Sequence, residues 1–227
     1  MAIGSAQDSK KEAVYDRLVE LVFSGTYEPG ANLTERALAE QLEVSRIPVR
    51  ESLGKMVAQG LLLGGGKREG VRIRQYTPDE VRQLYEFRLF LETGAVRAAA
   101  KYAQAADVEQ IEATWKEMEQ HVGDYGSQAW AKLDHQFHGA LAHASHNKRV
   151  IATVRLLLTE CHYVFYLRPS RQRRQPSATE AKEWMATVQR EHRQMIEQIV
   201  AGDADGAEQV IRQHIVPNRF LSQGNAV

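Results

Sequence analysis

Hydrophobic residues recur at intervals of three and four positions along almost the whole chain, which is the spacing of amphipathic helices. The segment QYTPD at residues 75–79 interrupts this periodicity. Before the interruption, the pattern predicts three helices followed by two short apolar pieces around a glycine-rich, basic tip, which is typical of a β-hairpin. We expect the helices at about 10–24, 34–42 and 45–60, and the hairpin at about 61–74.

After the interruption the pattern is helical to the end of the chain. Thr77 is a predicted N-cap, and Pro78 suits the first helical position because the amide hydrogen that proline lacks has no partner there. Six helices are predicted, at about 78–103, 106–121, 126–145, 148–167, 179–201 and 203–222. The expected fold class is therefore mainly α, with a winged helix-turn-helix domain at residues 1–76 and an all-α six-helix domain at 77–227.

Charge is balanced over the whole chain but not along it. The 227 residues include 29 basic and 29 acidic side chains, so composition alone indicates neither nucleic acid nor membrane as a partner. Residues 46–74, however, contain seven basic and two acidic residues, a local net charge of +5. The single cysteine, Cys161, cannot form an intrachain disulfide, and no stretch approaches the ~18 apolar residues of a membrane span. We therefore expect a cytoplasmic protein.

The basic segment lies where a winged helix-turn-helix contacts DNA. Ser45 is predicted to cap the third helix, and a proline falls within its first turn, where a missing amide is tolerated. Arg46 and Arg50 would then lie on neighbouring turns of the helix end that enters a major groove, where arginine binds guanine or phosphate. Lys67 and Arg68 at the hairpin tip suit contacts to phosphate or the minor groove. The alternative is an ordinary helix with solvated arginines.

The segment TERALAEQLEVSRIPVRESLGKMVAQGL, residues 34–61, resembles the DNA-binding domain of GntR-family bacterial transcription regulators. The similarity extends from about residue 10 to 74. It departs from the family pattern at Ile47, where threonine or serine is usual, and at Gly54, where a larger residue is common. With the charge pattern, the resemblance implies a set of operator-binding residues in the helix-turn-helix and the wing: Arg36, Ser45, Arg46, Arg50, Lys67 and Arg68.

Four ionisable residues interrupt the apolar stripes of three predicted helices in the second domain. Asp134 and His138 lie one turn apart on one inward face, while His192 and His214 interrupt the stripes of the last two helices. Burying these groups costs on the order of several kcal/mol unless they pair with one another or bind a cation. A carboxylate and three imidazoles suit zinc, nickel or manganese, so we predict one divalent ion per chain, with zinc preferred. The alternative is a buried Asp–His hydrogen-bond network.

Three segments that contain these residues, DHQFH, EHRQMIEQIVAGD and IRQH, resemble the FCD ligand-binding domain of the FadR subfamily of GntR regulators, in its shorter, VanR-like branch. In metal-containing members of that family, the aspartate and three histidines hold one metal ion beside a site for water or a carboxylate-bearing effector. His135, His143 and His146 do not match the pattern, and we expect them at the surface or behind the ligands.

Three further residues are candidates for effector binding. Arg88 matches an arginine in the E-x-R-x-x-x-E pattern of the family, which implies that it faces the pocket and receives a carboxylate. A second interpretation is that Arg88 only pairs with Glu92 and orients its helix. His162 and Tyr166 are candidates for lining the same cavity, although their periodicity does not decide this.

The sequence thus predicts a homodimeric transcription regulator that binds double-stranded operator DNA and responds to a small organic acid beside a metal ion. Relief of repression by the ligand is the expected sign. Two alternatives remain open. One is a metal-dependent enzyme domain fused to a DNA-binding head, which we do not favour because no separate carboxylate is spaced as an obvious general base. The other is a regulator whose metal is purely structural.

Overall fold

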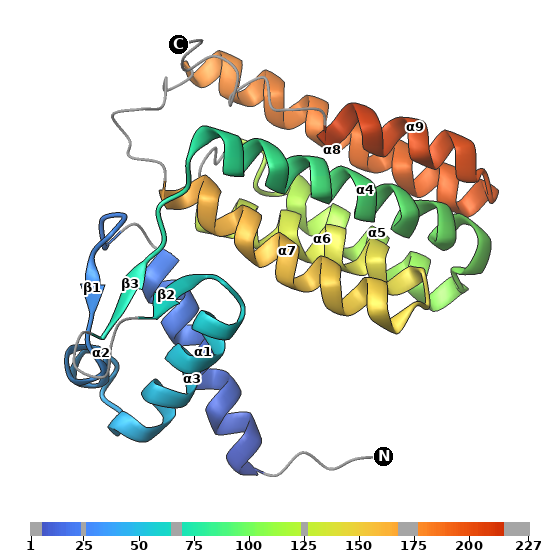
Figure 1. Ribbon diagram of the computed structural model, residues 1–227. Helices are drawn as coiled ribbons and strands as arrows, with labels where there is room; N and C mark the ends of the chain where they lie inside the picture. Colours follow the sequence, from blue (N-terminus) through green and yellow to red (C-terminus); the bar gives the residue numbers. More distant parts are fainter. Residues whose placement is uncertain (1–5, 24–25, 65–69, 124–126, 168–176, 216–227) are drawn as a thin grey trace. The chain divides into compact units, whose positions relative to one another are not determined.

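The computed structural model describes residues 6–23, 26–64, 70–123, 127–167 and 177–215 (Figure 1). The chain divides into two compact units. The first consists of residues 1–77 and 163–169, and the second of residues 78–162 and 170–227. Within the described ranges there are nine helices and one three-stranded sheet, which confirms the mainly α fold class.

The first unit is a helix-turn-helix with a small sheet. Its helices are α1 (Ala6–Phe23), α2 (Glu35–Leu42) and α3 (Arg46–Ala58). The Thr34 side chain accepts a hydrogen bond from the backbone of Ala37 and so starts α2, while Glu43 adopts a left-handed conformation that ends it. The turn into α3 is consequently short. The predicted helix-turn-helix is confirmed.

The sheet consists of β1 (Asn32–Leu33), β2 (Leu62–Gly64) and β3 (Val71–Ile73), in the order β1-β3-β2 with antiparallel pairing. The predicted hairpin corresponds to β2 and β3, which pair Leu62 with Ile73. The sequence does not predict β1, because two residues are too few to show an alternating pattern. Gly70, at φ +72°, is required where the wing returns, since a Cβ atom there would lie 2.5 Å from the carbonyl oxygen of Leu33.

Apolar side chains from the helices and the sheet fill the interior of this unit. The most buried include Leu18, Leu38, Met56, Leu61 and Ile73, each at most 1% exposed. Because these residues come from α1, α2, α3 and the sheet, their packing fixes the orientation of α3 relative to the sheet within this unit.

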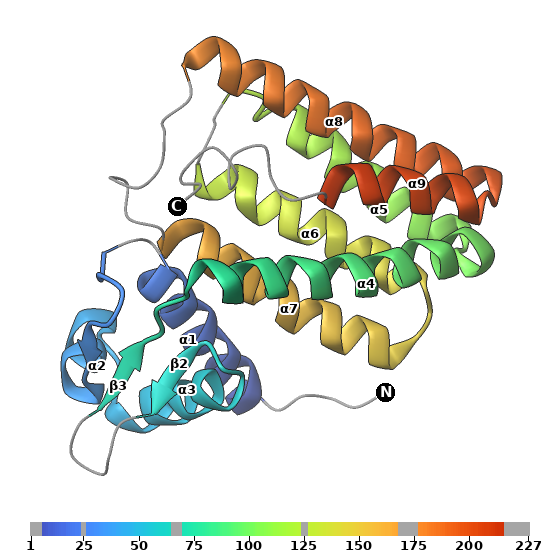
Figure 2. The same ribbon diagram turned by 45° about the horizontal axis from the view of Figure 1, so that its top comes forward.

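The second unit is a helical bundle, seen from two directions in Figures 1 and 2. Its six helices are α4 (Pro78–Tyr102), α5 (Ala105–Glu119), α6 (Gln128–Ala144), α7 (Lys148–Leu167, as far as residue 162), α8 (Ala178–Ala201) and α9 (Ala204–Ile215). All six were predicted within a few residues, although the last expected residues of α9 lie outside the described part. Ser177 and Glu180 form a capping box that starts α8, and Gly202 ends it in a left-handed conformation.

In the bundle, α4 packs against α6, α8 and α9, and α5 packs against α6 and α8. The shared core is apolar and includes Val96, Met118, Phe137, Met195 and Ile211, all fully buried. A charged or polar group in this core is surrounded by a low-dielectric interior and needs a partner. The helices that meet in it also carry the four predicted metal ligands.

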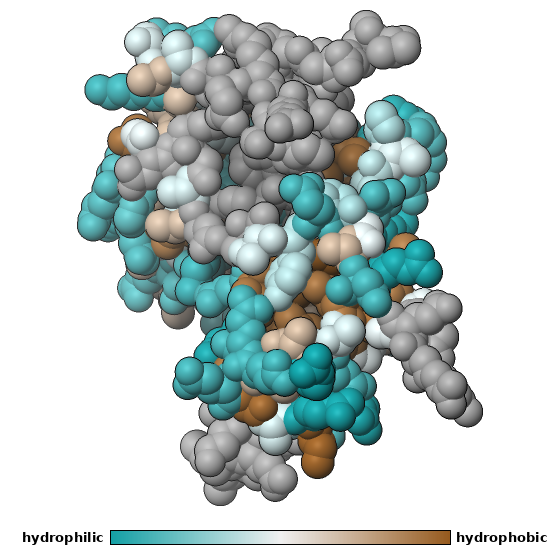
Figure 3. All heavy atoms as spheres, turned by 90° about the vertical axis from the view of Figure 1, so that its left-hand side faces the viewer, coloured by the Kyte–Doolittle hydropathy of each residue, from teal (hydrophilic) through white to brown (hydrophobic). Residues whose placement is uncertain are grey.

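Hydrophilic residues cover most of the described surface seen in Figure 3, with hydrophobic residues between them in smaller groups. None of the described helices has the length and apolar character needed to cross a membrane.

Candidate metal centre and nucleic-acid interface

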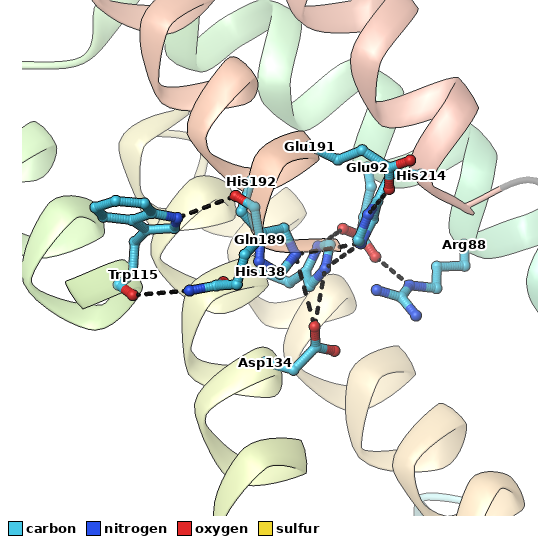
Figure 4. Close-up of polar contacts among 9 residues, drawn as sticks. All are labelled: Arg88, Glu92, Trp115, Asp134, His138, Gln189, Glu191, His192 and His214. Carbon is cyan, nitrogen blue, oxygen red and sulfur yellow. Dashed lines mark hydrogen bonds and ion pairs between the residues drawn. The ribbon is translucent and has the colours of Figure 1, made fainter. Parts of the chain in front are cut away.

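Asp134, His138, His192 and His214 converge inside the helical bundle (Figure 4). Asp134 and His138 project from α6, His192 from α8 and His214 from α9. The Nε2 atoms of His138 and His192 lie 3.1 and 3.3 Å from Nε2 of His214, and 3.8 and 3.6 Å from Oδ1 of Asp134. One donor atom from each residue therefore faces a common point, as expected from the sequence.

The three imidazoles are held away from water. His192 is fully buried and His138 is 1% exposed, among apolar residues such as Phe137, whose ring stacks on that of His192 at 4.1 Å. Burial lowers the pKa of His192 well below its ordinary value, and His214 and His138 lower it further. Burial likewise lowers the pKa of His214, against the effect of a hydrogen bond with Glu191. Both rings are therefore neutral at pH 7, the state in which histidine binds metals.

Two carboxylates behind the cluster orient two of the rings. Nδ1 of His138 is hydrogen-bonded to Oε2 of Glu92 on α4, and Nδ1 of His214 lies 3.0 Å from Oε2 of Glu191 on α8. A carboxylate accepts only, so each Nδ1 carries a proton, and a neutral ring of this kind presents the lone pair of Nε2 to the cluster. Sequence analysis did not assign either glutamate to the metal centre. Glu191 is adjacent to His192, but nothing in its spacing indicates that it serves His214.

The geometry fits a cation better than a hydrogen-bond network. The Nε2 atoms of His138 and His214 lie 3.1 Å apart, and two neutral rings that both carry their proton at Nδ1 cannot form a hydrogen bond between these atoms. A proton on His192 would satisfy one of them at most. In a tetrahedral site with bonds of about 2.0–2.1 Å, neighbouring ligand atoms are roughly 3.3 Å apart, close to the spacings observed here. These four residues can therefore hold a divalent metal ion.

Arg88 lies beside the cluster, and its guanidinium group points toward it in Figure 4. Its Nε donates to Oε1 of Glu92, so the predicted ion pair is present. Burial lowers the pKa of Arg88, but the charge of Glu92 and smaller electrostatic contributions, including that of Asp134, together outweigh it and raise this pKa. Nη2 of Arg88 is buried and has no hydrogen-bond partner among the described residues. An unpaired buried donor of this kind is available to an anion.

The remaining candidates lie at different places around the centre. His162 on α7 makes an edge contact with His135 at 6.2 Å, and Asp134 influences the pKa of both. Burial lowers the pKa of His162, and it lowers that of His135 to about 4. Tyr166 belongs to α7, but its side chain lies outside the described residues.

Two histidines at the end of α6 are separate from the centre. Nδ1 of His143 lies 3.4 Å from Oδ1 of Asp107, and Nε2 of His146 lies 2.7 Å from Oδ2 of the same aspartate. Both histidines are exposed, as predicted. They link the end of α6 to the start of α5.

The candidate DNA-binding arginines of α3 are exposed but not free. Nε and Nη2 of Arg50 donate to the two carboxylate oxygens of Glu35 at 2.9 and 3.0 Å, and Nη2 of Arg46 donates to Oε2 of Glu35 at 3.3 Å. Arg36 pairs with Glu40 one turn further along α2. Because both α3 arginines stay more than half exposed, a phosphate or base can still reach them.

The predicted cap of α3 needs correction, and the predicted wing contacts lie outside the described residues. Ser45 occupies the N-cap position of α3, but its side chain makes no capping hydrogen bond. The helix start therefore relies on backbone geometry and on the proline in its first turn. Lys67 and Arg68 lie outside the described residues. Ile47, where the family pattern departs, is 66% exposed and so lies at the surface.

Together, a helix-turn-helix with a basic recognition helix and a helical bundle with a metal-ligand set define a DNA-binding regulator with a sensory domain. Comparison with protein families agrees. Residues 10–72 match the bacterial regulatory proteins of the gntR family, and residues 83–216 match the FCD domain. The chain belongs to the GntR family of bacterial transcription regulators and carries an FCD effector-binding domain.

Individual relatives support this assignment. The "Putative L-lactate dehydrogenase operon regulatory protein" of Escherichia coli is 31% identical over 225 residues, covering 90% of this chain and 83% of the relative. The HTH-type transcriptional regulator LutR of Bacillus subtilis is 30% identical over 215 residues, covering 86% and 93%. The solved structure of McbR/YncC from Escherichia coli has the same fold, with a TM-score of 0.73 at 19% identity, covering 90% and 92%.

Proposed function

We propose that a small organic acid, bound beside a divalent metal ion in the helical domain, controls the affinity of this regulator for its operator. The proposal rests on one observation: a set of metal-ligand atoms and an unpaired buried guanidinium nitrogen lie side by side in the bundle. Four ligand atoms converge in the bundle, and the buried Nη2 of Arg88 beside them has no partner within the described chain. A carboxylate can occupy an open metal position while accepting a hydrogen bond from that guanidinium.

Asp134, His138, His192 and His214 would hold the ion, which would supply a positive charge and, by expanding beyond four ligands, a coordination position for the acid. One oxygen and three imidazole nitrogens suit zinc, and nickel or manganese accept the same set. Arg88 would bind the carboxylate, and His162, whose ring contacts that of His135 next to Asp134 in the chain, would line the same site. We assign residues 77–227 to this sensory domain and residues 1–76 to the DNA-binding domain.

On the DNA side, we assign the arginines of α2 and α3 to the operator. Arg46 and Arg50 lie in the first and second turns of α3, on the exposed side of the helix-turn-helix. Ser45 precedes them, Arg36 lies on α2, and Lys67 and Arg68 would extend the contact through the wing. We expect the acid to release a repressor from its operator.

The regulator would act as a homodimer, because an operator with two half-sites requires two reading domains. The outer face of α4 supports this assembly. Phe90 is 77% exposed and Phe87, one turn away, is 47% exposed, which is unusual for aromatic side chains on a helix of a folded domain. In light scattering, Phe90→Glu should lower the mass toward that of the monomer, while Lys132→Glu on α6 should leave it unchanged.

A thermal-shift screen of small carboxylates against metal-loaded and metal-stripped protein tests the proposal. L-lactate belongs in the panel because the name of one relative refers to an L-lactate dehydrogenase operon. We expect an acid that raises the melting temperature only when metal is bound, and that changes operator affinity by about 1–3 kcal/mol. Arg88→Gln should abolish the response to that acid.

Other outcomes would favour the alternatives. If chelation lowers the melting temperature but no acid changes that of the loaded protein, the metal is purely structural. If an acid that binds is also turned over, the helical domain is an enzyme.

A further inference from the structure

We propose that Glu92 is a positioning residue that couples the metal centre to Arg88, so that neutralising Arg88 tightens metal binding. The inference rests on the metal site of the proposed function and assigns a separate role to a residue behind it. Glu92 is 2% exposed and lies on α4, whereas the metal ligands lie on α6, α8 and α9. It is therefore a link between helices, not a ligand.

The link is formed by one carboxylate with a partner at each oxygen. Oε2 accepts from Nδ1 of His138, and Oε1 accepts from Nε of Arg88. The negative charge of Glu92 is therefore shared between a metal ligand and a cation. The guanidinium of Arg88 at one oxygen is the counter-charge of this buried carboxylate.

Because Glu92 shares its negative charge between His138 and Arg88, these two contacts compete. A carboxylate hydrogen-bonded to the Nδ1 proton of a histidine makes the opposite nitrogen a stronger metal ligand. Arg88 draws charge from Glu92 toward the guanidinium, which weakens that effect on His138. An anion bound at Nη2 of Arg88 would neutralise the guanidinium and return the charge of Glu92 to His138. Metal and anion would then each strengthen the binding of the other, because such coupling is reciprocal.

The structure offers a matched control in Glu191. It accepts from Nδ1 of His214 at 3.0 Å, so it plays the same part for another ligand, but the described structure shows no contact between Glu191 and Arg88. Replacing either glutamate by glutamine removes a carboxylate partner of a metal-binding histidine without changing side-chain volume. Only Glu92→Gln also breaks the connection to Arg88.

The test uses zinc alone and the full chain. Arg88→Gln imitates a neutralised Arg88, and zinc affinity is measured by chelator competition in three backgrounds. We expect Arg88→Gln to tighten zinc binding at least about twofold in the wild type and in Glu191→Gln, but not in Glu92→Gln. Glu92→Gln and Glu191→Gln should each weaken zinc binding by about 10- to 100-fold. A purely structural role for Glu92 would not remove the effect of Arg88.

The outcomes separate the inference from the proposed function. If the wild type binds no stoichiometric zinc, the metal site itself is wrong. If it binds zinc and Arg88→Gln has the same effect in all three backgrounds, the influence of Arg88 acts through space and the role of Glu92 is refuted.

A second measurement covers the case in which Glu92→Gln does not fold, since it leaves Arg88 without its counter-charge. In zinc-loaded protein, Arg88→Gln should shift the proton resonance of His138 Nδ1–H and leave that of His214 Nδ1–H unchanged. Equal shifts of both, or of neither, would overturn the proposal.

Discussion

Glu35, at the start of α2, holds the guanidinium of Arg50 on α3 by two hydrogen bonds, one to each of its carboxylate oxygens. The pair is exposed to solvent, so its contribution to stability is small. Its consequence is geometric, because a paired guanidinium keeps one orientation. The helix-turn-helix thus presents Arg50 in a defined position, with Glu35 as a competitor for any phosphate.

Replacing Arg50 by alanine should weaken specific operator binding by about 1–3 kcal/mol, since each well-placed arginine contact to a base contributes on that scale. Arg212→Ala is the control, because Arg212 pairs with Glu208 on α9 and lies outside the helix-turn-helix. Gel-shift titrations with operator DNA measure both. An unchanged footprint and affinity for Arg50→Ala would refute the assignment of α3 to the groove.

Replacing Glu35 by glutamine should increase affinity for random DNA and reduce discrimination in favour of the operator. The change removes a negative charge beside two arginines and frees the orientation of Arg50. Glu40→Gln makes the same charge change beside Arg36 and leaves Arg50 paired. Affinities for operator and random duplexes across a salt series separate the two effects. Equal loss of discrimination in both variants would show that only charge matters.

Replacing His192 by alanine should abolish stoichiometric metal binding, because its Nε2 atom is one of the converging donors in the core. His143→Ala is a matched control, since this exposed histidine pairs with Asp107 away from the centre. Metal content is measured on protein purified in zinc-containing buffer and then dialysed. Retention of metal by His192→Ala would mean that the ligand set is wrong.

Acidification should destabilise the metal-stripped protein between about pH 6.5 and pH 4. Burial lowers the folded-state pKa of His135 from its ordinary value of 6.5 to about 4. Burial also lowers the pKa of His192 well below that ordinary value. Below pH 6.5 the unfolded chain therefore takes up protons that the folded chain does not, and the free energy of unfolding falls. Each such group contributes at most about 1.4 kcal/mol per pH unit within its window.

Urea unfolding at several pH values measures this dependence. His135→Leu removes one of the groups and should give a shallower slope than the wild type. A slope that is the same in the wild type and His135→Leu would show that His135 does not take part.

The amino-acid sequence by itself determined the class of fold and the four residues whose side chains converge in the bundle. Apolar residues at helical spacing predict which face of a helix turns inward. An aspartate or histidine on that face, such as Asp134 or His192, can therefore be recognised from the sequence alone. The helix-turn-helix was equally local, because Thr34, the short turn and the basic start of α3 lie within a few residues of one another.

Tertiary structure alone decided which carboxylate lies beside which histidine, and that Arg50 pairs with Glu35. Glu92 meets His138 across 46 positions of the chain, and Glu35 meets Arg50 across 15. Periodicity gives the rotation of one helix about its own axis but not its axial offset from a neighbouring helix. That offset follows from side-chain packing over the whole core, so contacts between helices emerge only when the chain is folded.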